Sequence, residues 1–300
     1  MMRSVLIILA LVLSGAIYGQ NVLPPHLYLM NQTMLNPAYA GMHDNANLTA
    51  ISRGQWVGMD GAPFTHTLVG SSSLSHHSAA GFSLVKDSYG INSDTEIKIH
   101  YSYRIEMLNS VFSLGLQGGM INYKQDPSRL DVELSDDPLV HNAKASFSSP
   151  TFGFGMMYKS DRLYLGLGVP RITGTQLKTE EIFTKTVTPV YNLSGGFFIH
   201  LLNGLMVKPS FLLSYQDEEL LTDINAQLQV GNKVWLGASL RNLKSPGINL
   251  IFTEDDVFHL GYSYQIPVNE FELSSFGTHE LIVSIDMKFS KRQSLDRRYF

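Results

Sequence analysis

Residues 53–65 read Arg53-Gly54-Gln55-Trp56-Val57-Gly58-Met59-Asp60-Gly61-Ala62-Pro63-Phe64-Thr65. The glycines and the proline in the middle of this stretch are typical of a tight turn, and the flanking residues favour strands. The stretch therefore predicts a β-hairpin that carries an aromatic residue, Trp56, just before its turn. Shortly upstream, residues 36–41 (Asn-Pro-Ala-Tyr-Ala-Gly) contain both proline and glycine, which predicts neither helix nor strand there.

The rest of the chain repeats the same pattern of strand, turn and strand. In residues 96–107 every second side chain from Ile97 to Met107 is apolar, and the side chains between them are polar or charged. This period of two is the signature of a strand with one apolar face. The predicted strands are residues 47–56, 64–73, 79–88, 94–107, 110–124, 150–159, 162–169, 189–201, 205–215, 221–230, 233–241, 246–252, 257–266 and 279–289.

These strands are close to the ~9–11 residues that cross a bilayer at a tilt. Every second connection is very short, as at residues 108–109 and 203–204, whereas the connections between them include the two longest, 125–149 and 170–188. An all-β, transmembrane, antiparallel β-barrel of about 14 strands has this asymmetry, with its short turns in the periplasm. The hairpin turn at Trp56 then lies on the extracellular rim. A secreted β-sandwich is the alternative, because its strands alternate as well.

Composition excludes several other classes of protein. Only 16% of the residues are charged and the net charge is -4, without a basic stripe, so nucleic acid is not the expected partner. The chain has no cysteine, which excludes disulfides and thiolate metal sites.

The chain divides into four expected parts. Residues 1–19 resemble a secretory signal peptide, with Arg3 before a short apolar core and small residues after it; cleavage before Gln20 is expected, and cleavage after Ala16 is the alternative. Residues 20–46 form an N-terminal extended segment that either enters the barrel lumen or lies across its periplasmic mouth. Residues 47–289 form the barrel. Residues 290–300 form a basic periplasmic tail, either solvated or used for docking.

Few groups of side chains suggest chemistry. Glu96, Lys98, Arg104 and Glu106 lie on the polar face of one strand and are interpreted as lumen charges, which either pair within a wet interior or steer a translocating chain. The adjacent histidines 76–77, and the acidic pairs 136–137 and 255–256, lack the further ligands that a metal site needs. No nucleophile motif is present, so neither a catalytic residue nor a cofactor is expected.

The residues also carry a family resemblance. The segments 28–31 (Tyr-Leu-Met-Asn), 35–41, 53–58 and 61–63 resemble the PorP/SprF family, the outer-membrane proteins of the type IX secretion system in Bacteroidota. Weaker matches follow along the chain. They are residues 81–90, 152–155, 164–167, 208–210, 279–280 and 298–300. Residues 131–149 match nothing fixed.

The resemblance implies a non-enzymatic outer-membrane barrel that assists export or surface anchoring of cargo proteins such as adhesins, or that is linked to the gliding machinery. The implied partners are type IX components, a cargo with a C-terminal sorting domain, periplasmic lipoprotein or gliding-motor proteins, and outer-membrane lipid. A diffusion channel or hydrophobic-substrate transporter is the alternative function, and an outer-membrane enzyme is a third. The expected interaction residues lie in the two N-terminal motifs. They are Asn36, Pro37, Tyr39, Gly41, Arg53, Gln55, Trp56, Gly58, Gly61 and Pro63.

Overall fold

A computed structural model describes residues 24–42, 46–127, 145–172, 174–179, 183–201, 205–231, 233–270 and 272–287 of the 300-residue chain. The expected signal peptide, the basic tail, Gln20, the acidic pair 136–137 and most of loop 125–149 lie outside these residues. Among the described residues, no helix is long and apolar enough to cross a membrane.

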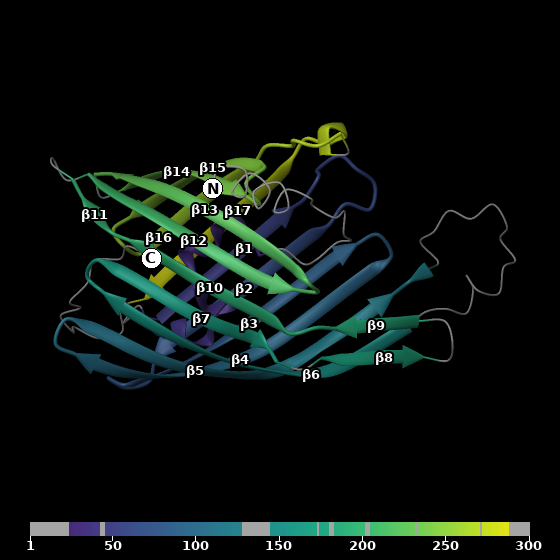
Figure 1. Cartoon of the computed structure of the whole chain (residues 1–300), viewed down its shortest axis with the longest axis horizontal. Coiled ribbons are helices and arrows are strands. Elements are labelled where there is room, and N and C mark those ends of the chain that lie inside the picture. The colour runs from purple at the N-terminus through teal and green to yellow at the C-terminus, as the bar shows by residue number, and fades with distance from the viewer. Residues whose placement is uncertain are drawn as a thin grey trace, which may run out of the picture.

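The described strands form a closed antiparallel barrel of 14 strands, as predicted (Figure 1). Consecutive strands pair along the chain, and the sheet closes because β1 pairs with β17 and β10 pairs with β12. The strands of the barrel wall are β1 (Ala46–Gly54), β2 (Phe64–Ser73), β3 (Ser78–Tyr89), β4 (Asn92–Met107), β5 (Ser110–Gln125), β6 (Ala145–Ser160), β7 (Leu163–Arg171), β10 (Val190–Phe197), β12 (Met206–Gln216), β13 (Glu219–Val230), β14 (Val234–Arg241), β15 (Ser245–Glu254), β16 (Phe258–Gln265) and β17 (Thr278–Met287).

The described residues include three further short strands. β8 (Thr175–Thr179) and β9 (Phe183–Val187) form a separate two-stranded hairpin that projects beyond the barrel, on the right of Figure 1. β11 (Ile199–His200) pairs only with the start of β12. The strand predicted over residues 189–201 is therefore interrupted after Phe197.

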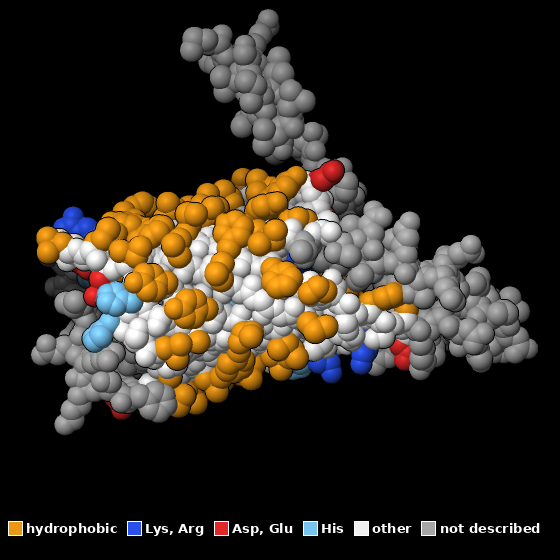
Figure 2. Space-filling model, turned by 90° about the horizontal axis from the view of Figure 1, so that it is seen from below, with side chains coloured by type: hydrophobic (Ala, Val, Ile, Leu, Met, Phe, Trp, Pro, Cys, Tyr) orange, Lys and Arg blue, Asp and Glu red, His pale blue; other side chains and the backbone are white. Residues whose placement is uncertain are grey.

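The wall has one apolar and one polar face, as the period of two predicts. On β4, the side chains from Ile97 to Met107 at every second position are exposed, whereas Lys98, His100 and Ser102 between them are buried in the lumen. Figure 2 shows apolar side chains over the visible barrel wall, with charged side chains near its two ends. An exposed apolar band around a polar interior is the arrangement of a membrane barrel, because lipid solvates only the outside.

The connections sort onto two rims. The short-turn rim carries the connections β2–β3, β4–β5, β6–β7, β13–β14 and β15–β16, together with the start of β1 and the end of β17. The long-loop rim carries the β1–β2 turn (55–63), the β5–β6 and β7–β10 connections and the β16–β17 loop (266–277), which contains the short helix η6 (Glu272–Ser274).

The segment before β1 is not extended as expected. It forms three one-turn helices, η1 (His26–Met30), η2 (Gln32–Met34) and η3 (Pro37–Tyr39). Residues 36–41 allow this because Pro37 stands at the first helical position, where its missing N–H leaves no hydrogen bond unmade. We call Pro24–Met42 the lumenal segment, since its side chains pack against lumen-facing residues of the wall.

Candidate functional site: the lumenal segment and the rim above it

The middle of the lumenal segment rests on glycines of β5, β6 and β7. A Cβ added at Gly115 would overlap the backbone of Ala38, one at Gly155 would overlap the Asn36 side chain, and one at Gly168 would overlap the Leu35 carbonyl. Glycine alone lets two backbones approach so closely. Gly115, Gly155 and Gly168 therefore form the surface on which η3 packs, and we call these three residues the glycine seat.

Asn36 fixes the geometry of η3 on this seat. Its side-chain oxygen accepts the Ala38 N–H at 3.0 Å, and its amide nitrogen donates to the Met156 carbonyl at 3.0 Å. The first bond caps the helix, and the second ties the cap to β6. This combination of a local cap and a wall contact explains why asparagine precedes proline here.

Wall side chains donate hydrogen bonds to backbone carbonyl groups within η3 and on either side of it. Asn192 donates to the Leu35 carbonyl (3.0 Å), Ser113 to that of Ala38 (2.8 Å) and Ser102 to that of Ala40 (2.7 Å). Buried carbonyls need such partners, because an unpaired one loses its hydration. The polar lumen face is thus fitted to the segment's backbone.

Arg104 holds the end of the lumenal segment near the short-turn rim. Its guanidinium donates to the Gly41 carbonyl (2.7 Å), the Ser73 hydroxyl (3.0 Å) and the Ser75 carbonyl (3.3 Å). Gly41 has φ +70°, and a Cβ there would overlap Ala79. Arg104 and Gly41 therefore stabilise the turn by which the chain leaves the lumen before β1 begins.

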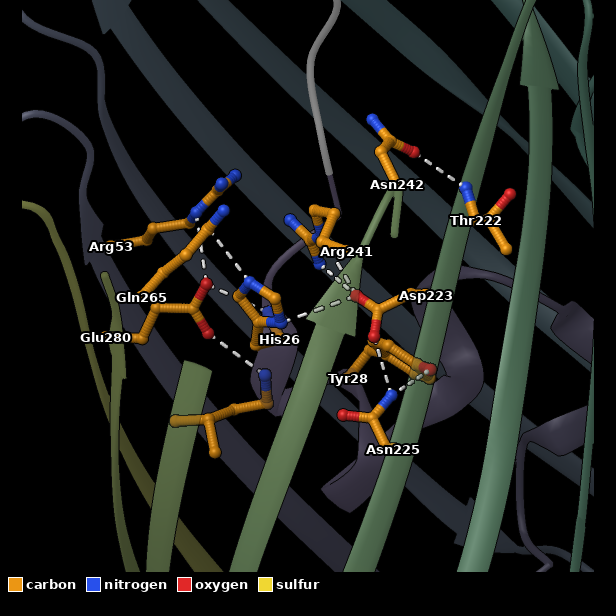
Figure 3. A network of polar contacts seen from close by, with 11 residues as sticks. His26, Tyr28, Arg53, Thr222, Asp223, Asn225, Arg241, Asn242, Gln265 and Glu280 are labelled. Atoms are coloured by element: carbon orange, nitrogen blue, oxygen red, sulfur yellow. Dashed lines mark hydrogen bonds and ion pairs between the residues drawn. The ribbon is translucent and has the colours of Figure 1, made fainter. Parts of the chain in front are cut away.

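The other end of the segment enters a network of buried charges at the long-loop rim (Figure 3). Glu280 accepts the backbone N–H groups of His26 (2.8 Å) and Leu27 (3.0 Å) and pairs with Arg53 (3.0 Å). The His26 ring lies 3.3 Å from Asp223, which also pairs with Arg241 (2.7 Å). We call these residues the His26 network.

Between its two ends, the segment combines apolar and polar contacts. Tyr28, Leu29 and Leu35 pack with Leu212 and Leu221 of the wall. Near this apolar cluster, the Tyr28 hydroxyl accepts from Asn225 (3.1 Å). Together the contacts bury nearly every described side chain of the segment, which runs inside the lumen from the long-loop rim to the short-turn rim.

The β1–β2 turn and the β16–β17 loop join above this segment. Val57 N–H donates to the Gly277 carbonyl (2.9 Å), and Phe276 N–H donates to the Val57 carbonyl (2.8 Å). Trp56 has φ +46°, which is unusual for a bulky residue and is often a mark of a functional position. Gly58 faces the Phe276 ring with no room for a Cβ.

A small cavity of about 40 Å³ opens between these two loops. Its lining includes Arg53, Gln55, Trp56, Gln265 and Glu272. Gln265 also bonds His26 through its side chain (2.9 Å), so the cavity lies directly above the His26 network. Its volume admits a few waters or one small group, not a large ligand.

The structure separates the expected interaction residues into two groups. Asn36, Pro37 and Tyr39 are buried in the lumen with Gly41, and they contact the barrel's own wall. The other group lies at or below the β1–β2 turn. It comprises Arg53, Gln55, Trp56, Gly58, Gly61 and Pro63.

The four expected lumen charges do not form one cluster. Glu96 pairs with Lys98 (3.0 Å) and with Arg171 of β7 (3.3 Å), whereas Arg104 binds the lumenal segment. Glu106 is exposed near the short-turn rim. A single strand, β4, therefore carries charges in three different settings.

Sequence reasoning missed the partners in the His26 network. Asp223 and Glu280 occupy polar, lumen-facing positions of alternating strands, and a carboxylate at such a position is the feature of the sequence that could have indicated a buried ion pair. Among the described residues, no group of three His, Cys, Asp or Glu side chains could hold a metal ion. His77 stacks on Tyr103 at 6.2 Å, and the acidic pair 255–256 forms a turn.

Comparison with known proteins identifies a family. Residues 18–285 match the family model described as type IX secretion system membrane protein PorP/SprF. No curated protein sequence matches the chain.

Several solved structures resemble the fold at low identity. A FadL homologue of Pseudomonas aeruginosa is 10% identical, with 85% of this chain and 94% of that chain covered and a TM-score of 0.46. The outer membrane protein Omp33 of Acinetobacter baumannii is 8% identical, with 83% and 100% covered and a TM-score of 0.48. The monoaromatic hydrocarbon channel TodX, as a deletion mutant, is 10% identical, with 88% and 95% covered and a TM-score of 0.49.

Proposed function

We propose that this chain, which belongs to the PorP/SprF family of type IX secretion system membrane proteins, is an accessory barrel that assists export or surface anchoring of a cargo protein. Membership places it among the components of that secretion system, in the outer membrane. In this role the barrel offers a binding surface to the cargo and does not conduct it. The long-loop rim faces the cell exterior, as the short turns of such barrels are periplasmic.

The segment held inside the lumen is the observation that carries the proposal. The lumenal segment is seated on glycines, capped by Asn36 and held at its two ends by Arg104 and the His26 network. A translocating polypeptide would have to share the lumen with this segment or displace it. The segment therefore favours an accessory role over the alternative of a diffusion channel or transporter.

The cargo would then meet the barrel at its exterior rim. Trp56, Gly58 and Gly61 belong to a short turn with positive φ at three residues, where an ordinary two-residue hairpin would suffice. Tryptophan is enriched among the residues that dominate protein interfaces. We assign the cargo contact, through its C-terminal sorting domain, to this turn and to the β16–β17 loop beside it.

Other partners fit the opposite rim. Periplasmic lipoprotein or gliding-motor proteins would reach the short-turn rim and the expected basic tail. A role in gliding is therefore a proposal about that rim, and it does not compete with cargo binding at the other.

The test is surface delivery of the cargo in cells that carry rim variants. We expect Trp56→Ala, and separately Gly61→Val, to leave a folded, heat-modifiable barrel in the outer membrane and to reduce cargo at the cell surface. Trp56→Phe should restore part of the delivery. Tyr101→Ala is the matched control, because Tyr101 is an exposed aromatic of the lipid face. Normal delivery with both rim variants would reduce the turn to a structural element and reject the assignment.

A further inference from the structure

The outward face of the wall changes its chemistry toward the long-loop rim. On β4, every second side chain from Met107 back to Ile97 is apolar and exposed, and the same face continues with Thr95 and Ser93. The stretch from Ile97 to Met107 rises ~25 Å at the usual strand tilt, which is the height of the apolar band of such barrels. Thr95 and Ser93 therefore lie beyond this band, at the level of the lipid headgroups.

Two lysines flank these hydroxyl groups on the neighbouring strands. Lys86 of β3 is paired with Thr95, and Lys124 of β5 is paired with Ser93. All these side chains face outward, because buried lumen positions alternate with them on β3, β4 and β5. We call Lys86, Ser93, Thr95 and Lys124 the lysine patch.

The lysine patch has no partner within the part of the chain that the structure describes. Its side chains form no hydrogen bond or ion pair there, and both lysines are exposed. The two outward register rows that contain the patch have no acidic residue. They are Ser52, His66, Lys86, Thr95, Asn122 and Ser148, and then Gly54, Phe64, Ser88, Ser93, Lys124 and Ser146.

The spacing of the two lysines fits a shared anionic group. They stand two strands and two residues apart, which places their Cα atoms ~12 Å from each other. Both long side chains can therefore reach one headgroup that lies over Thr95 and Ser93.

The same rim is apolar on another side of the barrel. Tyr191, Tyr215 and Leu220 are cross-strand neighbours on the outward face of β10, β12 and β13, and each is about half exposed. An aromatic girdle is usual at this level, so the lysine patch is a local feature of the wall. In Figure 2, Lys and Arg side chains lie past the apolar ones toward the right-hand end, where β8 and β9 project in Figure 1.

We propose that the lysine patch binds the phosphorylated headgroup of a glycolipid in the outer leaflet of the membrane. The two ammonium groups donate to phosphate oxygens, and the hydroxyl groups of Ser93 and Thr95 bond the sugar between them. The exposed Leu84 and Ile97, one step further into the apolar band, contact the acyl chains. The choice of leaflet rests on the orientation given under the proposed function.

Native mass spectrometry of the purified full-length barrel tests the site. A glycolipid with a bisphosphorylated disaccharide headgroup should remain bound, and its dephosphorylated form and phosphatidylglycerol should bind at least ~10-fold more weakly. Lys86→Gln with Lys124→Gln should weaken binding of the phosphorylated glycolipid roughly 30-fold, because each lysine near an anionic headgroup layer contributes about fivefold. Lys86→Arg with Lys124→Arg should retain binding.

Lys233→Gln with Lys244→Gln is the matched control, since it removes the same charge from two exposed lysines outside the patch. Equal loss of binding in the two Gln pairs, or equal binding of the dephosphorylated glycolipid, would overturn the proposal. Neither cargo nor the orientation in cells enters this measurement, so its failure is distinct from a failure of the proposed function. Labelling of Glu270→Cys with an impermeant maleimide on intact cells checks the leaflet, and labelling only after permeabilisation would overturn that assignment.

Discussion

Gly115→Ala should loosen the lumenal segment without opening the barrel wall. The added methyl group would overlap the backbone of Pro37 and Ala38, and neither can rotate away as a flexible side chain could. Overpacking of a close contact costs typically ~1–3 kcal/mol, and a clash with backbone belongs at the upper end. About 3 kcal/mol corresponds to roughly a 100-fold increase in the population of undocked segment.

A thiol placed in the segment measures that population. Thr33 is 2% exposed, and cysteine is similar to it in size, so Thr33→Cys should be protected in the native barrel. When closing is faster than labelling, the rate of thiol labelling follows the free energy of local opening. In the Thr33→Cys background we expect Gly115→Ala to raise this rate by about two orders of magnitude, with unchanged heat-modifiability of the barrel.

Gly118→Ala is the matched control on the same strand. Its new methyl group would come no closer than 3.6 Å, to the Phe152 side chain, and would not meet the lumenal segment. We expect the labelling rate of Thr33→Cys to be unchanged by it. Equal rates in the two variants would refute the docking of η3 on the glycine seat.

Two further predictions concern the wall. Ile99 lies in the middle of β4 and is 71% exposed, so Ile99→Arg should reduce the amount of assembled barrel, because a charge at the bilayer midplane costs ~2–4 kcal/mol. Glu106→Arg at the rim should cost only ~0–1 kcal/mol. Equal amounts of the two variant barrels in the membrane would mean that Ile99 does not face lipid. Glu280→Gln should lower the free energy of unfolding of the purified barrel by about 3 kcal/mol, because it removes the carboxylate that pairs with the buried Arg53 guanidinium. The double variant with Arg53→Gln should lose less than the sum of the two single variants, and strict additivity would mean that the pair is not coupled.

The sequence predicts the wall well and the contents of the lumen poorly. Alternation along β4 and β13 follows directly from the two-sided environment of a membrane strand, so the period of two finds nearly every strand. Two predictions differ from the described strands: the strand predicted from residue 189 is interrupted after Phe197, and the connection predicted over residues 170–188 contains the β8–β9 hairpin. The register with β12 continues across the break after Phe197, which falls where the opposing residue is Pro209; proline has no N–H to donate to the ladder, and apolar periodicity does not report that.

Contacts across the lumen are not encoded in any local pattern. Glycine has a low propensity for strands, so Gly115 and Gly155 are unfavourable in β5 and β6 when the strands are considered alone. Only the position of η3 shows that these glycines make room for another stretch of backbone. Arg104 lies among other charges on β4, yet its partners come from residues 41, 73 and 75. The sequence motif at residues 36–41 is specific for the same reason: each residue fits a surface made by distant strands.

Ion conductance of the purified full-length barrel in planar bilayers tests the central claim most directly. With the lumenal segment docked, the full-length protein should show no stable channel. A variant that lacks residues 24–42 should conduct if its wall still closes, which heat-modifiability verifies. Steady conductance by the unmodified protein, at the level of the deletion variant, would contradict a filled lumen and return the barrel to the class of diffusion channels.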